Sequence, residues 1–398
     1  MRTDRLLLVS FAGMLALAAC SGPSGPEPSA RETAVTPPAS AAPSSSPSAT
    51  ESGSPEDGGT HEFTIVEHER FDEPWAMAFL PGTDVLAITE RPGNILLRDG
   101  AGLREVDGVP EVVAQGQGGL ADLIPGPTFG TDGTVYLSWV EGDGSGRTGG
   151  VVAKATLDLE RAELTGLTRI WEQEPKVDGS GHFSLRLAIR GDDLFVTSGE
   201  RQQMNPAQDP ANNLGAIVRL TLDGEPAPGN PLGEGPVAGQ LYSIGHRNPL
   251  GIAFDADGRL WSSEMGPQGG DELNLIRPGL NYGWPEVSNG SHYGGGEIPD
   301  HAPGDGFAPP KVFWNPSVSP GSLMIYSGDL FPNWRGDAFL GALSGEALIR
   351  VDLDGEDAAE AETWPMGNRI RAVTEALDGA IWLLEDGAGG RLLELRPA

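Results

Sequence analysis

Histidine is scarce in this 398-residue chain, so each of its six copies can be weighed as a candidate catalytic base. His182 follows the loop Asp178-Gly-Ser-Gly and precedes an apolar run, at a junction where a side chain can point into a central channel. An imidazole titrates near neutral pH, which suits a group that takes a proton from a substrate. A hydrogen-bonded structural histidine is the alternative for His182, and it is the role expected for His246.

Two groups of arginines offer a second kind of chemistry. Arg247 and Asn248 precede one apolar run, and Arg369-Ile-Arg371 precedes another. Alternate residues of an extended segment point to the same side, so Arg369 and Arg371 are expected to face one way. Guanidinium groups bind carboxylates through paired hydrogen bonds. These residues could therefore form an anion site, and salt bridges to the abundant Asp and Glu are the alternative.

A third group of residues suits a hard cation. The segment Glu264-Met-Gly-Pro-Gln-Gly-Gly-Asp-Glu-Leu-Asn-Leu is followed by Asn281-Tyr-Gly-Trp-Pro. Carboxylates, together with carbonyl groups held in place by Gly and Pro, are oxygen ligands of the kind that Ca²⁺ binds. The spacing is not that of an EF-hand loop, so the pattern alone indicates a calcium site only weakly.

A repeated β unit must position these residues. Each copy is a strand, a turn rich in Asp and Gly, and a second apolar strand, which is typical of a hairpin whose turn needs a positive φ. The copies begin at Trp75, Leu120, Leu185, Gly251, Ser322 and Ala372. Six copies at about 55 residues each match four-stranded propeller blades with inserted loops.

We therefore expect an all-β fold, a single six-bladed β-propeller of four-stranded antiparallel sheets over residues 61–398. In a propeller the site lies where the loops between strands converge on the central channel. The long insertions at about 200–215 and 279–318 are the loops in which function is expected.

Composition excludes several classes of protein. The net charge is −31, so the chain repels a phosphate backbone and nucleic acid is not an expected partner. The single cysteine, Cys20, excludes a disulfide framework and any cysteine-based metal site.

The N-terminus has the features of a targeting segment. Arg2 and Arg5 precede a short apolar run that ends at Cys20, as in a bacterial lipoprotein signal in which the cysteine is lipidated. We expect a signal peptide over residues 1–19 and a Ser/Pro/Ala-rich disordered tether over residues 20–60. Such a protein is extracytoplasmic and held at the membrane by a lipid only; an ordinary secretory signal is the alternative.

Together, these stretches resemble the soluble pyrroloquinoline quinone (PQQ) dependent sugar dehydrogenases, the glucose/sorbosone dehydrogenase family. The resemblance extends from Trp75 to Leu395, and Gly199-Glu200 is closer to its aldose-type branch than to the classical glucose enzymes. It implies a six-bladed propeller independently of the repeat count. The motifs that carry it are Pro74-Trp75 through Glu90-Arg91, Gly116-Gln-Gly-Gly-Leu, Gly181-His-Phe, Gly245-His-Arg-Asn-Pro, Gly266-Pro, Asn281-Tyr-Gly-Trp-Pro and Arg369-Ile-Arg.

The resemblance also implies a role for individual residues. His182 would be the base that takes the proton of the sugar C1 hydroxyl, and Glu200 would orient or tune it. Residues at the PQQ cofactor or at the rim of its site would be Gln117, Arg247, Asn248, Tyr293, Arg369 and Arg371. The carbonyls of Gly266 and Pro267 would hold one Ca²⁺ that also touches PQQ, and Glu272 and Tyr282 match a second, structural Ca²⁺ site that uses backbone oxygens.

One position departs from the family pattern. The family usually has a lysine in the fifth repeat that contacts PQQ, and Ser344 stands there in Gly341-Ala-Leu-Ser-Gly-Glu. The loss of that cation should weaken PQQ binding or change the electronics of the quinone.

The expected function is the oxidation of aldose sugars to lactones with PQQ and Ca²⁺, by a monomer that passes electrons to a quinone, a cytochrome or a dye. A calcium-dependent propeller hydrolase of the lactonase kind is one alternative. It would require an ion ligated by side chains in the channel rather than converging arginines. A non-catalytic propeller that binds sugars or a protein partner is the other, and the missing lysine favours it.

Overall fold

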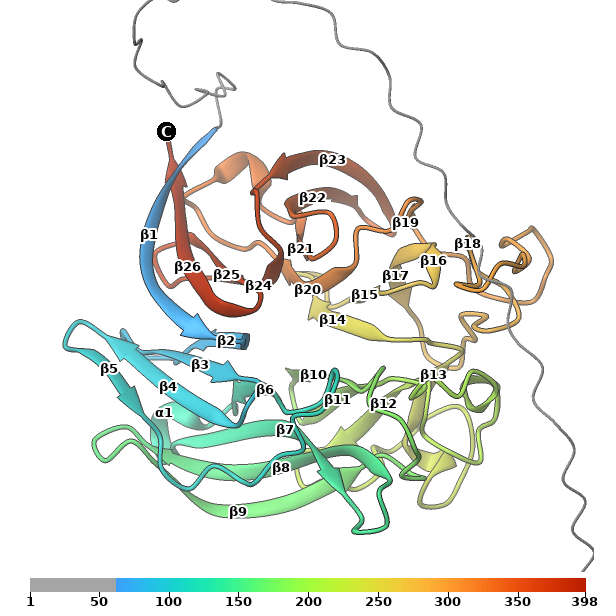
Figure 1. The fold of residues 1–398 in the computed structure, drawn as a ribbon, viewed down its shortest axis with the longest axis horizontal. Coiled ribbons are helices and arrows are strands. Elements are labelled where there is room, and N and C mark those ends of the chain that lie inside the picture. Colours follow the sequence, from blue (N-terminus) through green and yellow to red (C-terminus); the bar gives the residue numbers. More distant parts are fainter. Residues whose placement is uncertain (1–61) are drawn as a thin grey trace, which may run out of the picture. The chain divides into compact units, whose positions relative to one another are not determined.

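Six four-stranded antiparallel sheets surround a common axis in the computed structural model, which describes residues 62–398 (Figure 1). The predicted signal peptide, Cys20 and the tether lie outside the described residues. The first three blades, each from its inner to its outer strand, are β2 (Pro74–Phe79), β3 (Leu86–Glu90), β4 (Asn94–Asp99) and β5 (Gly102–Glu105); β6 (Leu120–Pro125), β7 (Thr134–Gly142), β8 (Thr148–Asp158) and β9 (Glu163–Glu172); and β10 (Ser184–Arg190), β11 (Asp193–Ser198), β12 (Ala216–Thr221) and β13 (Leu241–Ile244).

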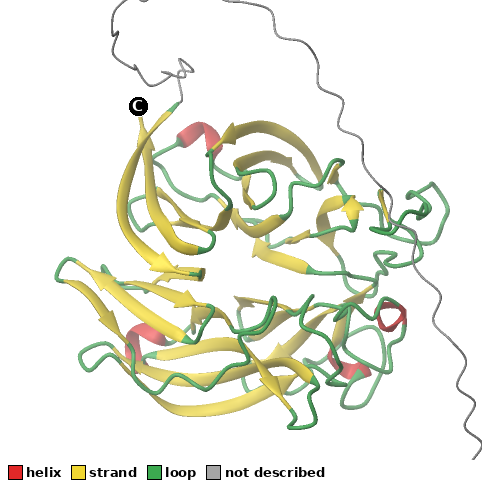
Figure 2. Cartoon of the chain, in the orientation of Figure 1, coloured by secondary structure: helices red, strands yellow, loops and turns green. Residues whose placement is uncertain are grey.

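The other three blades follow the same plan. Helices are few and short among the strands (Figure 2). The strands of these three blades are β14 (Pro249–Phe254), β15 (Leu260–Glu264), β17 (Asp271–Ile276) and β19 (Val312–Trp314); β20 (Pro320–Ile325), β21 (Ala338–Ala342), β22 (Ala347–Asp354) and β23 (Asp357–Pro365); and β24 (Ile370–Glu375), β25 (Ile381–Glu385), β26 (Ala388–Pro397) and β1 (Phe63–Asp72). The remaining elements are the small pair β16 (Gln268–Gly269) and β18 (Gly290–Ser291), the helix α1 (Phe129–Asp132) and the 3₁₀ turns η1 (Asn205–Gln208), η2 (Ala238–Gln240) and η3 (Pro332–Trp334).

The six sequence repeats are the two innermost strands of each blade, so the predicted six-bladed propeller is confirmed. The first strands, β2, β6, β10, β14, β20 and β24, each pack against the next and close a ring around the channel. Each inner hairpin turns at a glycine with positive φ, a conformation that glycine adopts without steric cost. These glycines are Gly82, Gly133, Gly191, Gly258, Gly336 and Gly379.

The ring closes through its two chain ends. The N-terminal strand β1 is the outermost strand of the sixth blade and pairs with the C-terminal strand β26, from Phe63 opposite Pro397 to Asp72 opposite Ala388. Sequence repeats cannot show this pairing, because β1 has no hairpin partner next to it in the chain. The predicted insertion at 279–318 also contains the outer strand β19 of the fourth blade.

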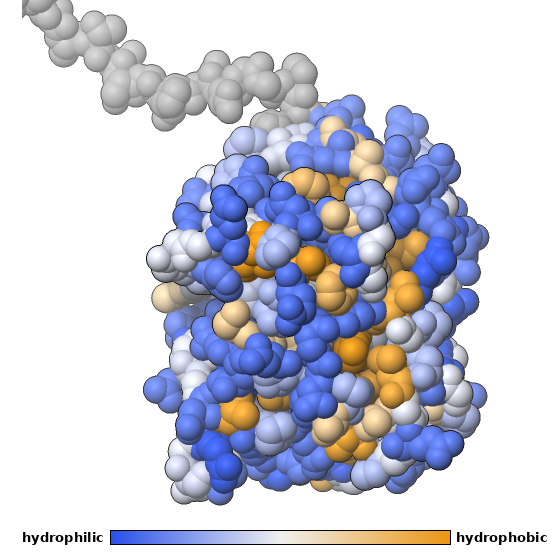
Figure 3. All heavy atoms as spheres, turned by 90° about the vertical axis from the view of Figure 1, so that its right-hand side faces the viewer, coloured by the Kyte–Doolittle hydropathy of each residue, from blue (hydrophilic) through white to orange (hydrophobic). Residues whose placement is uncertain are grey.

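The apolar core lies between neighbouring blades rather than on the axis. Leu97 and Leu137 belong to the cluster between the first and second blades, and Trp261 and Leu340 to that between the fourth and fifth. Hydrophilic residues predominate on the side of the propeller that Figure 3 shows, with apolar residues between them. Among residues 62–398, no helix is long and apolar enough to cross a membrane.

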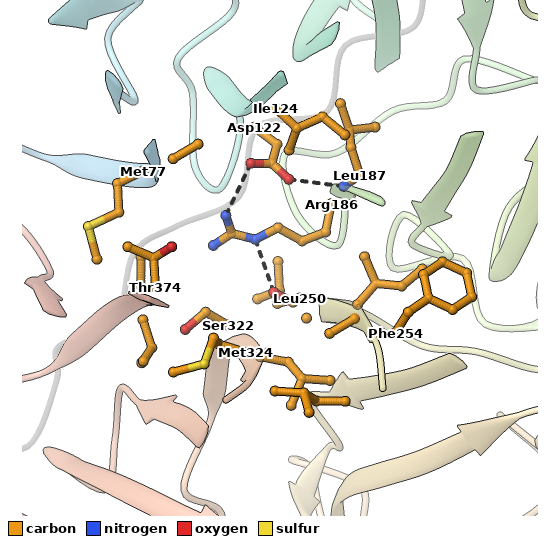
Figure 4. A pocket seen from close by; sticks show the side chains of 18 residues that line it. Met77, Asp122, Ile124, Arg186, Leu187, Leu250, Phe254, Ser322, Met324 and Thr374 are labelled. Atoms are coloured by element: carbon orange, nitrogen blue, oxygen red, sulfur yellow. Dashed lines mark hydrogen bonds and ion pairs between the residues drawn. The ribbon is translucent and has the colours of Figure 1, made fainter. Parts of the chain in front are cut away.

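A buried arginine crosses the channel and lines one of its two cavities. Arg186, on β10, donates from Nε to the carbonyl of Leu250 at 3.0 Å and from Nη2 to those of Trp75 at 3.2 Å and Gly321 at 2.8 Å. Its Nη1 lies 3.8 Å from Asp122 Oδ1. One side chain of the third blade thereby contacts four other blades. The cavity that it lines, of about 320 Å³, opens where the inner strands end (Figure 4).

Candidate active site

The second cavity, of about 290 Å³, lies where the inner strands begin. Loops and strand ends from all six blades reach it, as expected for the functional face of a propeller. Its lining residues are Trp75, Gln117, Phe183, Ser184, Asn248, Leu250, Met265, Tyr293, Ser319, Leu343, Arg369 and Arg371. Five of the predicted site residues thus line one cavity: Gln117, Asn248, Tyr293, Arg369 and Arg371.

His182 and Glu200 form a hydrogen-bonded pair beside this cavity. His182 immediately precedes the lining residue Phe183, and its Nδ1 contacts Glu200 Oε1. Glu200 is fully buried, and its other carboxylate oxygen accepts the backbone N–H of Met204. With Nδ1–H donated to the carboxylate, Nε2 of His182 is the nitrogen that can accept a proton. The side chain of Gln117 fixes the same residue from the other side, because its Oε1 accepts the His182 backbone N–H at 2.7 Å.

The surroundings of His182 favour the neutral imidazole. Burial lowers the pKa of His182 from its ordinary value, and the positive charges of Arg247 and Arg201 lower it further. The hydrogen bond and charge of Glu200 oppose this and raise the pKa, but the net shift is downward. His182 is therefore unprotonated at neutral pH and able to act as a base.

This balance makes the Glu200→Gln variant informative. The change keeps the shape of the side chain and removes the charge that raises the His182 pKa, so the acidic limb of the kcat/KM profile should move to lower pH. We expect turnover at the pH optimum to fall, since the imidazolium formed during the reaction loses its carboxylate partner. A kcat/KM profile from pH 4 to pH 8 checks both effects, and an acidic limb that moves upward would contradict this electrostatic role.

Two arginines of the sixth blade meet at one carboxylate. Arg371 is buried and donates from Nε to Asp386 Oδ1 at 2.8 Å, and Arg369 Nε donates to Asp386 Oδ2 at 2.7 Å. The Arg371 guanidinium also lies 4.0 Å from the centre of the Trp75 ring. Burial lowers the Arg371 pKa to about 10, so it remains a cation at neutral pH. Two positive groups share one negative group here, which leaves positive charge for a bound anion.

Arg247 and Asn248 bring polar groups from the fourth blade. Arg247 Nη1 donates to the Met265 carbonyl at 3.0 Å, and its guanidinium lies 5.2 Å from the Trp284 ring centre. The Nε of Arg247 is buried without a hydrogen-bond partner among the described residues. Asn248 Oδ1 accepts the Ser184 hydroxyl at 3.0 Å. An unpaired buried guanidinium nitrogen beside the cavity fits a ligand that carries carboxylates.

The Gly266-Pro267 segment lies behind Met265 and is buried. The backbone N–H of Gly266 donates to Asp271 Oδ1 at 2.8 Å. The other oxygen of Asp271 accepts the N–H groups of Val318 at 2.7 Å and Ser319 at 2.6 Å, so this carboxylate joins the fourth blade to the fifth. The Gly266 amide therefore points toward Asp271 inside the protein. This contact fixes the segment whose carbonyls are predicted to be ligands.

Glu272 is buried near other carboxylates, and the His301 imidazole Nε2 lies 3.9 Å from its Oε1. Burial and the nearby Glu264 raise its pKa to about 8. Its Oε2 accepts the Asn274 amide at 3.0 Å, and Asn274 Oδ1 is buried without a partner in the described part of the chain. A buried carboxyl beside an unpaired carbonyl oxygen fits a hard cation, which would hold the carboxyl ionised. The Tyr282 hydroxyl is engaged by the Leu275 carbonyl at 2.6 Å, so a metal contact there would use its main-chain oxygen.

Two predicted residues lie at the edge of the cavity. Tyr293 is 73% exposed at its rim, with its ring centre 5.8 Å from the Arg247 guanidinium. Ser344 is exposed and does not line the cavity, but its hydroxyl lies 2.8 Å from that of Ser319, which does. His246 is fully buried between Ser243 at 2.9 Å and Glu264 at 2.9 Å, so the structural role expected for it is confirmed.

Comparison with known proteins assigns the family. The model of the family described as Glucose / Sorbosone dehydrogenase matches residues 71–394, nearly all of the propeller. The chain belongs to this glucose/sorbosone dehydrogenase family. The family predicted from the motifs is thereby confirmed, and with it the prediction of an oxidoreductase.

Individual members of the glucose/sorbosone dehydrogenase family cover the same region. The chain is 36% identical over 342 residues to aldose sugar dehydrogenase YliI of Escherichia coli, covering 83% of this chain and 92% of that protein. The apo crystal structure of the soluble E. coli aldose sugar dehydrogenase matches with a TM-score of 0.81 and 34% identity, over 84% of this chain and all of the other. The PQQ-bound aldose sugar dehydrogenase of Streptomyces coelicolor matches with a TM-score of 0.70 and 30% identity, over 84% and 98% of the two chains.

Proposed function

We propose that the protein oxidises aldose sugars at the C1 hydroxyl to lactones, with PQQ as cofactor and Ca²⁺ as its metal. The observation that carries this proposal is that the His182–Glu200 pair and the cationic groups Arg247, Arg369 and Arg371 converge on one cavity. A base and an anion site side by side are what a carboxylated redox cofactor and an alcohol substrate need. The names of relatives, an aldose sugar dehydrogenase and a PQQ-bound form of one, support the same activity.

The residues of the chain have separate tasks in this proposal. PQQ is an orthoquinone with three carboxylates, and it supplies the hydride acceptor when bound. Nε2 of His182 takes the proton of the C1 hydroxyl, and Glu200 stabilises the imidazolium that results. Arg247, Arg369 and Arg371 neutralise carboxylates, and the buried Nε of Arg247 offers a donor that no protein group uses.

Calcium has two places in this proposal. The carbonyls of Gly266 and Pro267 would hold one ion beside the cofactor, where a cation polarises an oxygen as a Lewis acid. Glu272 and the main-chain oxygen of Tyr282 would hold a structural ion, and the unpaired Oδ1 of Asn274 supports a cation there.

The cellular setting is part of the proposal. We propose a monomer anchored at the outer side of a bacterial membrane through a lipid on Cys20. Its electrons would pass to a quinone or a cytochrome.

Reconstitution of the purified protein tests the activity. PQQ and Ca²⁺ added together should give a bound-cofactor absorbance, and aldoses should then reduce a dye. Hydrolysis of lactones without PQQ would instead favour the lactonase kind of propeller. Sugar binding without any PQQ binding would favour a non-catalytic propeller.

Ser344→Lys tests how the fifth blade faces the cofactor. A new cation next to Ser319 should add a charge-assisted contact of roughly 1.5–3 kcal/mol, which corresponds to about one to two decades in PQQ affinity. The set of sugars oxidised should not change. Fluorescence quenching during a titration of metal-loaded apoprotein with PQQ measures the affinity.

Ser327→Lys is the matched control, because Ser327 is an exposed serine beyond the opposite end of β20, where its hydroxyl contacts Glu375. Its PQQ affinity should equal that of the parent protein. Unchanged or weaker binding in a folded Ser344→Lys variant would show that position 344 does not face the cofactor.

A further inference from the structure

Backbone strain in this propeller is concentrated around the candidate base. Ten non-glycine residues among residues 62–398 have a positive φ, and six of them lie in two short segments, 182–185 and 201–204. His182 itself has φ 51°, and Arg201, which follows Glu200, has φ 60°. Such conformations persist only where the surroundings hold them, and they cluster at functional sites. Some group must therefore hold these two segments in place.

The Arg201 side chain is placed to hold the first segment. It is fully buried and donates from Nε to the Gly181 carbonyl at 3.0 Å and from Nη2 to the Gly179 carbonyl at 2.7 Å. Gly179 and Gly181 belong to the loop that leads directly into His182. The guanidinium also lies 3.7 Å from the centre of the ring of Phe183, the residue that follows His182.

The same guanidinium attaches this loop to the second blade. Arg201 Nη1 donates to the Thr148 carbonyl at 2.6 Å, and Nη2 lies 3.1 Å from the Thr148 hydroxyl. Thr148 is the first residue of β8, a strand anchored on both sides within its blade. Its hydroxyl in turn donates to the Gly179 carbonyl at 3.0 Å. The planar guanidinium of arginine, with its fork of several N–H donors, can reach all these fixed acceptors at once, and the single ammonium of a lysine cannot.

Arg201 has no ion-pair partner within the part of the chain that the structure describes, although it is fully buried. Burial lowers its pKa to about 10, so it is a cation at neutral pH. The charge of Glu200 favours the cation, but all the hydrogen bonds of the Arg201 guanidinium go to neutral groups, which is a costly way to bury a charge and suggests a purpose other than stability.

We propose that Arg201 is a positioning residue for the base: its guanidinium fixes loop 179–182 against the second blade and thereby directs His182 toward Glu200. The proposal rests on the proposed role of His182 as the base. Nothing in the sequence singles out Arg201, because the residues that it contacts lie about 20 to 50 positions away in the chain.

Arg201→Met and Arg201→Lys separate the fork from the charge. Arg201→Met removes the donors to Gly179, Gly181 and Thr148, so kcat should fall at least tenfold with KM within about threefold, as expected for a small misplacement of a catalytic group. Arg201→Lys keeps the charge and loses the fork, and should retain part of the lost kcat. Arg190→Met is the matched control: Arg190, at the far end of β10, also donates to a carbonyl, that of Gly258, and lies over a phenylalanine ring at 5.4 Å.

A second readout needs neither cofactor nor sugar. The charged groups that face His182 are Glu200, Arg247 and Arg201. Arg201→Lys keeps the positive charge and loses the fork, so a His182 ring that no longer faces Glu200 should have a lower NMR titration midpoint than in the parent, with the signal assigned by a His182→Ala variant. Amide hydrogen exchange of residues 179–184 should become faster in Arg201→Met and remain parental in Arg190→Met.

Each outcome decides the role of Arg201. A folded Arg201→Met variant with parental kcat and parental exchange overturns it. If Arg201→Met does not fold, parental kcat, His182 titration and exchange in Arg201→Lys overturn it, because the fork is then not needed. A parent protein that does not reduce dye with aldoses would instead refute the proposed function, and the titration and exchange results would still decide whether Arg201 positions His182.

Discussion

Replacement of His182 by alanine should lower kcat by about 10²–10⁴-fold, the usual contribution of a general base. Binding of PQQ should remain close to parental, since the cationic groups come from the fourth and sixth blades. The structure adds a reason for a large effect: Glu200 is fully buried and would lose its imidazole partner. Stopped-flow dye reduction on PQQ-loaded protein measures the effect, and a PQQ titration of the same preparation shows that the cofactor is still bound.

His68→Ala is the matched control for this experiment. His68 also pairs with a glutamate, Glu394, at 2.8 Å, and its ring stacks on that of Trp382 at 4.6 Å, but the pair lies in the outer strands of the sixth blade. Its removal should leave turnover at the parental rate. If the His182 variant also turns over sugar at the parental rate, His182 is not the base.

Exhaustive chelation of calcium should abolish turnover and lower the melting temperature. Anything that binds the folded state alone stabilises it, so removal of the ion withdraws that contribution. Returned Ca²⁺ should restore both properties, and Mg²⁺ should restore them poorly, because irregular cages of carbonyl oxygens suit the larger ion. Dye reduction and thermal unfolding of the same samples check the two effects together. Full activity after chelation would remove calcium from the mechanism.

The Glu272→Gln variant locates the structural ion. Without metal the Glu272 carboxyl is mostly neutral at pH 7, because its pKa is raised to about 8, so the neutral Gln variant should unfold at close to the parental temperature. Its calcium affinity should be at least about tenfold weaker, which is 1.4 kcal/mol. Glu286→Gln, a change at an exposed position of the neighbouring loop, should behave as the parent does in both measurements. A Glu272→Gln variant that gains as much stability from Ca²⁺ as the parent would place the ion elsewhere.

The inner half of each blade could be predicted from the sequence because hairpins are local. Their apolar strands and glycine turns lie within about 20 residues of chain, and the count of six follows from them. The outer strands are less regular, and β1 is paired across the whole length of the propeller. Strands that pair across so many residues of sequence leave no local sequence pattern that would predict the pairing.

At the site, too, the sequence reveals residues with suitable chemistry but not the partners that hold them in place. His182, Arg247, Arg369 and Arg371 stand out by their chemistry in motifs that resemble a known family. Asp386 does not stand out, although it joins Arg369 to Arg371, because it is one of many acidic residues in a chain of net charge −31. Partners of this kind are defined by the fold rather than by spacing, and only the structure reveals them.

The closure of the ring through β1 and β26 also fixes an order of assembly. The ribosome makes β1 first, and β26, its neighbour in the sixth blade, is the last strand of the chain. The sixth sheet therefore cannot be completed until synthesis has ended, and until then β1 carries an unpaired edge. The β26 strand of a second copy would fit that edge as well as its own does, so two chains that emerge close together could exchange strands and seal both rings.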